Sequence, residues 1–377
     1  MTPFFQLNDR HSKTRSSMIN VIKPFMPPQK EFDQYLKDIW NRAWVTNNGP
    51  LVNELELSLK NYLGVPHLFF VTNGTIALQI AIKALKLNGE IITTPFSFVA
   101  TTSSIVWEGC TPVFVDIDPS TYNIDPELIE AAITPETTAI LATHVFGNPC
   151  PAEEISTIAR KHNLRVIYDA AHAFGTFYKG EPVVHQGDIS TLSFHASKLF
   201  HTVEGGALIT HDPEIANHIA HMRNFGFHGP EAFQGIGING KNCEFHAAMG
   251  LCNLKYIDQI LQRRQHLSET YHSMLKALQV GRPFLNPDPG FNFAYYPILF
   301  DNEKTVLKVI SALQAIYVYP RRYFYPSLDT LSYVRPDQPV RVSRDVSSRV
   351  LCLPLYHDLS VEEVKMICRA ILRAERY

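Results

Sequence analysis

Between residues 68 and 210, short apolar runs alternate with longer stretches in which apolar positions recur at helical spacing. The short runs are rich in β-branched and aromatic residues and predict strands at 68–71, 91–93, 112–115, 139–142 and 165–168. The stretches between them predict helices at 75–85, 98–107, 125–133 and 153–161. Nearly continuous apolar strands indicate a sheet buried on both faces, so we expect an α/β fold with mostly parallel strands.

The alternation changes after residue 169. Two strands, 191–195 and 206–210, are separated by only a short loop, and a long helical pattern then covers 244–278. A further strand at 297–300 and helices at 304–315 and 361–374 predict a smaller α+β unit. We therefore expect a large α/β domain over residues 1–245, followed by a linking helix and a small C-terminal α+β domain over 246–377.

The composition is that of an ordinary soluble enzyme. The 377 residues are 45% hydrophobic and 19% charged, with a formal net charge of -2 and no basic stretch, so nucleic acid is not an expected partner. No apolar run approaches the length of a membrane span, and the polar first twenty residues do not resemble a signal peptide. Six scattered cysteines and sixteen histidines show no metal-ligand spacing. We expect a cytoplasmic protein without a metal site.

Two of the predicted strands end in residues suited to binding an anion or a cation. The first ends at Asn73-Gly74-Thr75, where the following helix presents free N–H groups, Gly74 permits close approach and Thr75 offers a hydroxyl. This turn is a candidate phosphate site, although a simple capped turn has the same sequence. The strand 165–168 ends in Asp169, which is either a carboxylate facing the same cleft or a helix cap or salt-bridge partner.

A third strand end carries Lys198, which closes the segment 193–198 and is followed by Leu199 and Phe200. Apolar surroundings would lower the pKa of this amine, as Schiff-base chemistry requires, whereas an ordinary surface lysine is the alternative. An amine for an aldehyde, a carboxylate for a pyridinium nitrogen and a phosphate site are together what pyridoxal 5′-phosphate (PLP) requires. We therefore predict that Lys198 forms a Schiff base with PLP.

Four motifs resemble those of the DegT/DnrJ/StrS aminotransferases: 73–75, 168–175, 193–198 and Glu204-Gly205-Gly206. Their order and spacing also fit, and the similarity extends from Thr46 to Leu355. The resemblance implies a fold-type I PLP enzyme that transfers an amino group, usually from L-glutamate, to a nucleotide-linked keto sugar. It also implies a homodimer with shared active sites.

The resemblance assigns roles to individual residues. Lys198 matches the Schiff-base lysine and Asp169 the pyridinium partner. The other cofactor-binding positions are Gly74, Thr75 and Ser193 for the phosphate, Phe98 and Ala171 for the two ring faces, His172 near the phenolic oxygen, and Asn239 reaching the phosphate of the neighbouring subunit. Ser197 replaces the usual Thr, and Lys241-Asn242 replaces Arg-Met, which leaves the detail of the cross-subunit contact open.

Two further segments are candidates for substrate binding. Asn47 lies in the polar loop 46–50, which either approaches the substrate or only forms a turn. The segment 320–326 contains Arg321, Arg322, Tyr323 and Tyr325, which either contact the sugar nucleotide or form a surface loop with packed aromatics. Similarity in both segments favours dTDP-4-keto-6-deoxyglucose as acceptor. A 3-keto sugar aminotransferase, a PLP-dependent sugar dehydratase and a non-catalytic regulator are the alternatives, and the presence of Lys198 favours transamination.

Overall fold

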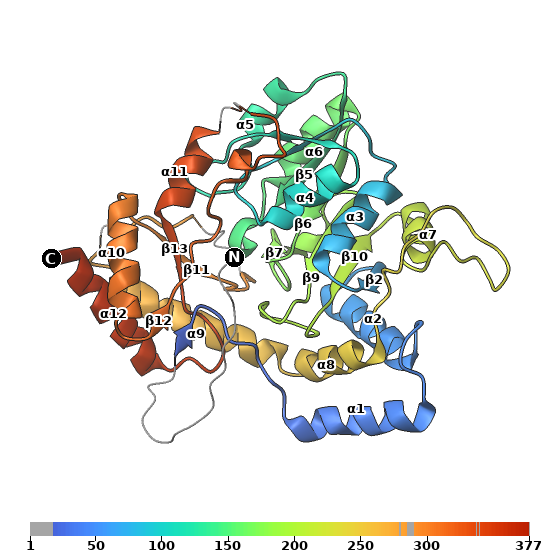
Figure 1. Cartoon of the computed structure of the whole chain (residues 1–377), viewed down its shortest axis with the longest axis horizontal. Helices are drawn as coiled ribbons and strands as arrows, with labels where there is room; N and C mark the ends of the chain where they lie inside the picture. The colour runs from blue at the N-terminus through green and yellow to red at the C-terminus, as the bar shows by residue number, and fades with distance from the viewer. Residues whose placement is uncertain (1–17, 279, 285–289, 337, 339, 377) are drawn as a thin grey trace.

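The computed structural model describes residues 18–278, 280–284, 290–336, 338 and 340–376, and it confirms the predicted α/β fold. A seven-stranded sheet forms its centre (Figure 1). Six of its strands run in the same direction, and β10 is antiparallel to both neighbours. The strand order is β2 (His67–Val71), β10 (Gly206–Thr210), β9 (Ile189–Ser193), β6 (Arg165–Asp169), β5 (Thr137–Thr143), β3 (Glu90–Thr93), β4 (Thr111–Phe114).

Helices cover both faces of this sheet, which explains the nearly continuous apolar strands. In β10, Leu208 packs in one core with α3 (Gly74–Ala84) and α7 (Pro213–Met222). The adjacent Ala207 and Ile209 point to the opposite core, with α2 (Pro50–Leu63) and α8 (Glu244–Leu254). Farther along that face, α6 (Ala152–His162) packs against β5 and β6.

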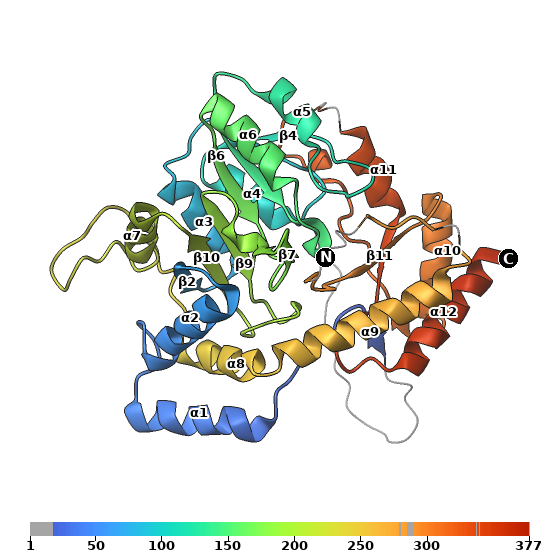
Figure 2. The ribbon, with the colours of Figure 1, turned by 180° about the vertical axis from the view of Figure 1, so that it is seen from behind.

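The C-terminal part has its own apolar core, formed where α12 packs against both α9 and α10, together with two small sheets (Figure 2). One sheet pairs β11 with β13, and the other pairs the N-terminal β1 with β12. The elements are α9 (Ile257–Leu275), α10 (Glu303–Gln314), α12 (Val361–Arg376), β11 (Tyr296–Leu299), β13 (Val350–Leu353), β1 (Ile19–Asn20) and β12 (Val318–Tyr319). The division between domains at residues 245 and 246 stays a proposal; it falls within α8.

Smaller elements complete the fold. They are α1 (Gln29–Arg42), α4 (Val99–Trp107), α5 (Pro126–Ile129), α11 (Arg341–Arg349), the hairpin of β7 (Phe177–Tyr178) and β8 (Glu181–Pro182), and 3-10 turns at Glu130–Ala132, Val145–Gly147, Val183–His185 and Leu328–Thr330. No helix in the described ranges is long and apolar enough to cross a membrane.

Three predicted elements differ from the structure. The helix expected at 244–278 is two helices, because the chain breaks at Lys255 and Tyr256, whose side chains both bind Glu31 in the first turn of α1. The strand expected at 191–195 ends at Ser193, so His195 lies in the following loop. The helix expected at 125–133 is one short α-helical turn followed by a 3-10 turn.

Candidate active site

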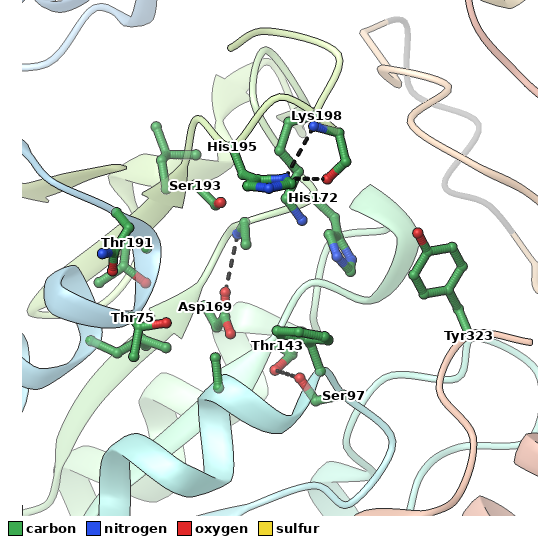
Figure 3. Close-up of a pocket in the computed structure, with 18 of the residues that line it drawn as sticks. Thr75, Ser97, Thr143, Asp169, His172, Thr191, Ser193, His195, Lys198 and Tyr323 are labelled. Carbon is green, nitrogen blue, oxygen red and sulfur yellow. Dashed lines mark hydrogen bonds between the residues drawn. The ribbon is translucent and has the colours of Figure 1, made fainter. Parts of the chain in front are cut away.

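A cavity of about 540 Å³ opens at the carboxyl ends of the central strands (Figure 3). This is where an open α/β sheet presents its loops and helix N-termini to a ligand. The structure brings most of the sequence-predicted residues to its walls: Gly74, Thr75, Phe98, Asp169, Ala171, His172, Ser193, Lys198, Arg321 and Tyr323.

A chain of buried hydroxyl groups ends at Asp169, the last residue of β6. Thr101 Oγ1 donates to Asp169 Oδ2 at 2.7 Å, and Ser97 Oγ lies 2.7 Å from Thr101 Oγ1 and 3.1 Å from Thr143 Oγ1. The N–H of Ala171 also donates to Asp169. Because the ionised carboxylate can only accept, each hydroxyl donates toward it in turn. Burial raises the pKa of Asp169, and these hydrogen bonds oppose that rise.

Lys198 lies in the loop that follows β9, held by a hydrogen bond from its N–H to the carbonyl of His195 at 2.8 Å. Burial lowers the pKa of its amine to about 8; Asp169 raises that pKa and Arg321 lowers it. An amine with this pKa is partly neutral near physiological pH, and the neutral form is the nucleophile.

The N-terminus of α3 forms a narrow seat beside the end of β9. The side chain of Asn73 caps the helix by accepting the N–H of Ile76 at 2.9 Å, and Gly74 and Thr75 begin the helix at the cavity wall. A Cβ atom on Gly74 would lie 3.0 Å from the Cβ of Ser193, a tight contact, so this close approach favours glycine.

Aromatic residues hold His172 at the floor of the cavity. Its ring stacks on Phe324 with 5.4 Å between centroids and an interplanar angle of 7°, and it meets the edge of Tyr295 at 4.8 Å. Burial lowers the pKa of His172, so the ring is neutral. Its Nδ1 is buried and has no hydrogen-bond partner among the described residues.

These features fit PLP. Burial raises the pKa of the Asp169 carboxyl, and a protonated pyridine nitrogen beside it would favour its ionised form. The amine of Lys198 is available for an aldehyde, and the seat formed by Gly74, Thr75 and Ser193 suits a phosphate. The unpartnered Nδ1 of His172 leaves a polar atom for a ligand oxygen.

Four of the predicted residues do not line this cavity: Asn47, Asn239, Arg322 and Tyr325. Asn47 is in a loop with a φ of 60°, and Asn239 accepts a hydrogen bond from Lys241 at 2.6 Å in an exposed segment. Arg322 pairs with Glu303 at 2.7 Å and its guanidinium lies 3.4 Å from the ring centre of Tyr325. Their binding roles stay predictions. In the described ranges, no three His, Cys, Asp or Glu side chains gather as a metal site.

Sequence reasoning missed several residues that line the cavity, among them Ser97, Thr143, Tyr295 and Phe324. It also missed Thr101, which does not line the cavity but donates to Asp169. Ser97 and Thr101 are hydroxyl residues four positions apart, shortly after a predicted strand, which was an available signal. Tyr295 comes from the C-terminal part, and no local pattern connects it to β6. Phe324 lies within the candidate segment 320–326, but its sequence position does not indicate that it stacks on His172.

Comparison with known proteins agrees with this geometry. The model of the DegT/DnrJ/EryC1/StrS aminotransferase family matches residues 28–372. The chain is 43% identical to a dTDP-4-amino-4,6-dideoxy-D-glucose transaminase of Shigella dysenteriae, over 94% of this chain and 98% of that protein. A transaminase of the same name from Escherichia coli is 40% identical, with the same two coverages.

Among solved structures, DesI in the presence of its TDP-sugar product superimposes with a TM-score of 0.89 at 33% identity. The match covers 95% of this chain and 93% of DesI. With a family match over nearly the whole chain and a cavity that meets the needs of PLP, the chain belongs to the DegT/DnrJ/EryC1/StrS aminotransferase family.

Proposed function

We propose that this enzyme transfers the amino group of L-glutamate to C4 of dTDP-4-keto-6-deoxyglucose, giving dTDP-4-amino-4,6-dideoxyglucose. The observation that carries the choice of sugar is the 40–43% identity to two transaminases named for that product, over nearly their full lengths. Members of this family use PLP, which supplies a conjugated ring that accepts electrons when a C–H bond at the amine-bearing carbon breaks.

In this proposal, Lys198 holds the resting cofactor and moves the proton. Its pKa of about 8 supports the first role, because about a tenth of the amine is neutral at pH 7, far more than for an ordinary lysine. When its amine is free, Nζ of Lys198 accepts the proton from the donor's Cα. It then donates that proton to a second carbon of the reacting system.

Asp169 keeps the ring nitrogen protonated, supported by the hydrogen bonds from Thr101 and Ala171 that favour its ionised form. Gly74, Thr75 and Ser193 bind the phosphate, Phe98 and Ala171 pack on the two faces of the ring, and His172 lies near the phenolic oxygen. All of these line one cavity of one chain.

Asn239 would serve the cavity of a second copy of this chain. Its segment carries exposed apolar side chains, including Phe233 at 68% and Ile236 at 88% exposure, which favour burial against a partner. Figure 1 shows the segment after α7 extending away from the body of the molecule. We therefore propose a homodimer in which each subunit contributes to both active sites.

A mass-spectrometric assay tests the proposed reaction. The holoenzyme is given L-glutamate with either dTDP-4-keto-6-deoxyglucose or its 3-keto isomer, and both the nucleotide product and 2-oxoglutarate are measured. We expect the 4-amino sugar and 2-oxoglutarate in equal amounts. Amination of the 3-keto isomer alone, or loss of water from the sugar without 2-oxoglutarate, would replace this proposal with one of the alternative reactions.

A further inference from the structure

Arg321 is a charged group of the cavity that the proposed cofactor contacts leave without a role. The two acidic residues on the cavity wall are engaged: Asp169 accepts from Thr101 and Ala171, and Glu204 Oε1 lies 3.6 Å from His195 Nε2. Arg321 forms no ion pair with an acidic side chain in the described ranges. Because arginine stays charged, its guanidinium offers a positive charge to a ligand.

Arg321 is exposed, but its backbone pairs with the buried strand β13. Its N–H donates to the carbonyl of Cys352 at 3.1 Å, and its own carbonyl accepts the N–H of Cys352 at 2.8 Å, with Cys352 fully buried in β13. Its Cζ lies 4.7 Å from the ring centre of the buried Tyr323. Figure 3 shows Tyr323 on the side of the cavity contributed by the C-terminal part. Arg321 is therefore held in place, with the planar edge of its guanidinium able to bind an anion.

The adjacent arginine is used differently. Arg322 pairs with Glu303 at 2.7 Å and donates to the carbonyl of Ser348 at 2.9 Å, so its guanidinium joins α10 to the end of α11. Of the two guanidinium groups in this segment, only that of Arg321 lines the cavity.

We propose that Arg321 binds the donor's α-carboxylate, the one attached to its amine-bearing carbon. This inference rests on the proposed aminotransferase function and names the group that recognises the amino-acid donor. A planar guanidinium matches a carboxylate in a two-point hydrogen bond, which orients the donor as well as attracting it.

The position of Arg321 favours the donor over the sugar nucleotide. In an amino acid, the carboxylate is one bond from the carbon that reacts. In a 4-keto sugar nucleotide, the diphosphate is attached at C1, on the opposite side of the pyranose ring from the reacting C4. Arg321 and Lys198 line the same cavity, where the reacting carbon must lie, and the charge of Arg321 also lowers the pKa of that amine. A positive charge near the reacting carbon suits the adjacent carboxylate better than the more distant diphosphate.

The test measures binding separately from catalysis. Glutarate carries the two carboxylates of glutamate but has no amine to react, and dTDP carries the nucleotide and diphosphate without the sugar. The affinity of the holoenzyme for each probe is measured by isothermal titration calorimetry. The variants are Arg321→Met, Arg321→Lys and, as a matched control, Arg369→Met on the exposed side of α12. Each variant's content of bound PLP and melting temperature are compared with those of the wild type.

We expect Arg321→Met to weaken glutarate binding roughly 10- to 100-fold, as loss of charge-assisted hydrogen bonds does, and to leave dTDP binding within about twofold. Arg321→Lys keeps the charge without the two-point geometry, so its affinity for glutarate should lie between those of the wild type and Arg321→Met. It also keeps the inference testable if Arg321→Met does not fold. Arg369→Met should match the wild type. Loss of dTDP binding with glutarate unchanged, or no change in either, would overturn the inference.

Failure of the proposed function gives a different result. If the wild type binds glutarate through Arg321 but does not aminate the 4-keto sugar, the donor site stands and the acceptor is wrong.

Discussion

The hydroxyl of Thr101 donates to Oδ2 of Asp169 at 2.7 Å, and both side chains are buried. Burial is the largest influence on Asp169 and raises its pKa, whereas the bond from Thr101 is the largest influence that lowers it. The charge that the proposed PLP site requires at Asp169 therefore depends on a residue in α4, a helix distant in sequence from β6.

Replacing Thr101 with Val should weaken cofactor binding while leaving the fold intact. The change removes one hydrogen bond to a charged group, and we expect PLP affinity to fall roughly 10- to 100-fold. Absorbance titration of the apoenzyme with PLP measures the affinity. The matched control is Thr102→Val, because the Thr102 hydroxyl is buried with no hydrogen-bond partner among the described residues. Equal effects of the two substitutions would show that the bond to Asp169 is unimportant.

The contrast between Asp169 and Thr101 shows how much of the site could be predicted. Asp169 ends an apolar strand, and Gly74 and Lys198 follow within a few residues of two other strand ends. A sheet brings such ends together whatever the details of packing. The contributions of Thr101, Tyr295 and Phe324 depend on how separate segments pack in three dimensions. Their positions follow from tertiary contacts, which short-range hydrophobic periodicity does not encode.

The same distinction applies to the fold. The strands of the central sheet were predictable because burial on both faces leaves a continuous apolar run. The break between α8 and α9 was not, because it coincides with contacts from Lys255 and Tyr256 to Glu31, which is more than 220 positions away in sequence.

The rate at which the apoenzyme incorporates PLP should rise with pH. The pKa of Lys198 is about 8 and only its neutral form attacks an aldehyde, so the neutral fraction increases as pH rises through that value. Between pH 7 and pH 9 we expect a rise of about tenfold, followed by a plateau. Stopped-flow absorbance measures the rate.

Two variants test the assignment of this pH dependence. Asp169→Asn removes a charge that raises the pKa of Lys198, so it should move the midpoint to lower pH. Lys198→Ala should abolish the covalent absorbance change. A midpoint near 10.5, the ordinary value for lysine, would contradict the prediction.

Glu244 should be important for stability although it is not in the cavity. Its buried carboxylate accepts the N–H groups of Leu51 and Val52 at the start of α2, at 3.1 and 2.9 Å, and pairs with Arg42 at 3.2 Å. Glu244→Gln removes the charge and places an amide donor against these donors. We expect the free energy of unfolding to fall by about 1–3 kcal/mol, measured by denaturant titration of the holoenzyme. Glu54→Gln, on an exposed side of α2, should have little effect. Similar losses of stability in both variants would argue that Glu244 does not stabilise the start of α2 by capping it.

Sharing of active sites between two copies can be tested by mixing inactive variants. Lys198 and Asp169 line one cavity of one chain, whereas Asn239 does not line that cavity. If Asn239 acts in the partner's site, a dimer of one Lys198→Ala subunit and one Asn239→Ala subunit has one site with both residues intact. Random exchange of subunits should then restore about a quarter of wild-type activity, since half of the dimers are mixed and each has one working site of two.

The matched control mixes Lys198→Ala with Asp169→Ala. Because these two residues belong to the same cavity, every site in the mixed dimer lacks one of them, and no activity should return. Activity is measured after the subunits are exchanged in mild denaturant and reassembled, with size-exclusion chromatography to verify dimers. Recovery in both mixtures, or in neither, would mean that Asn239 does not complete the partner's site. Recovery in the first mixture alone requires that the exposed segment of one chain reaches the cofactor cavity of the other.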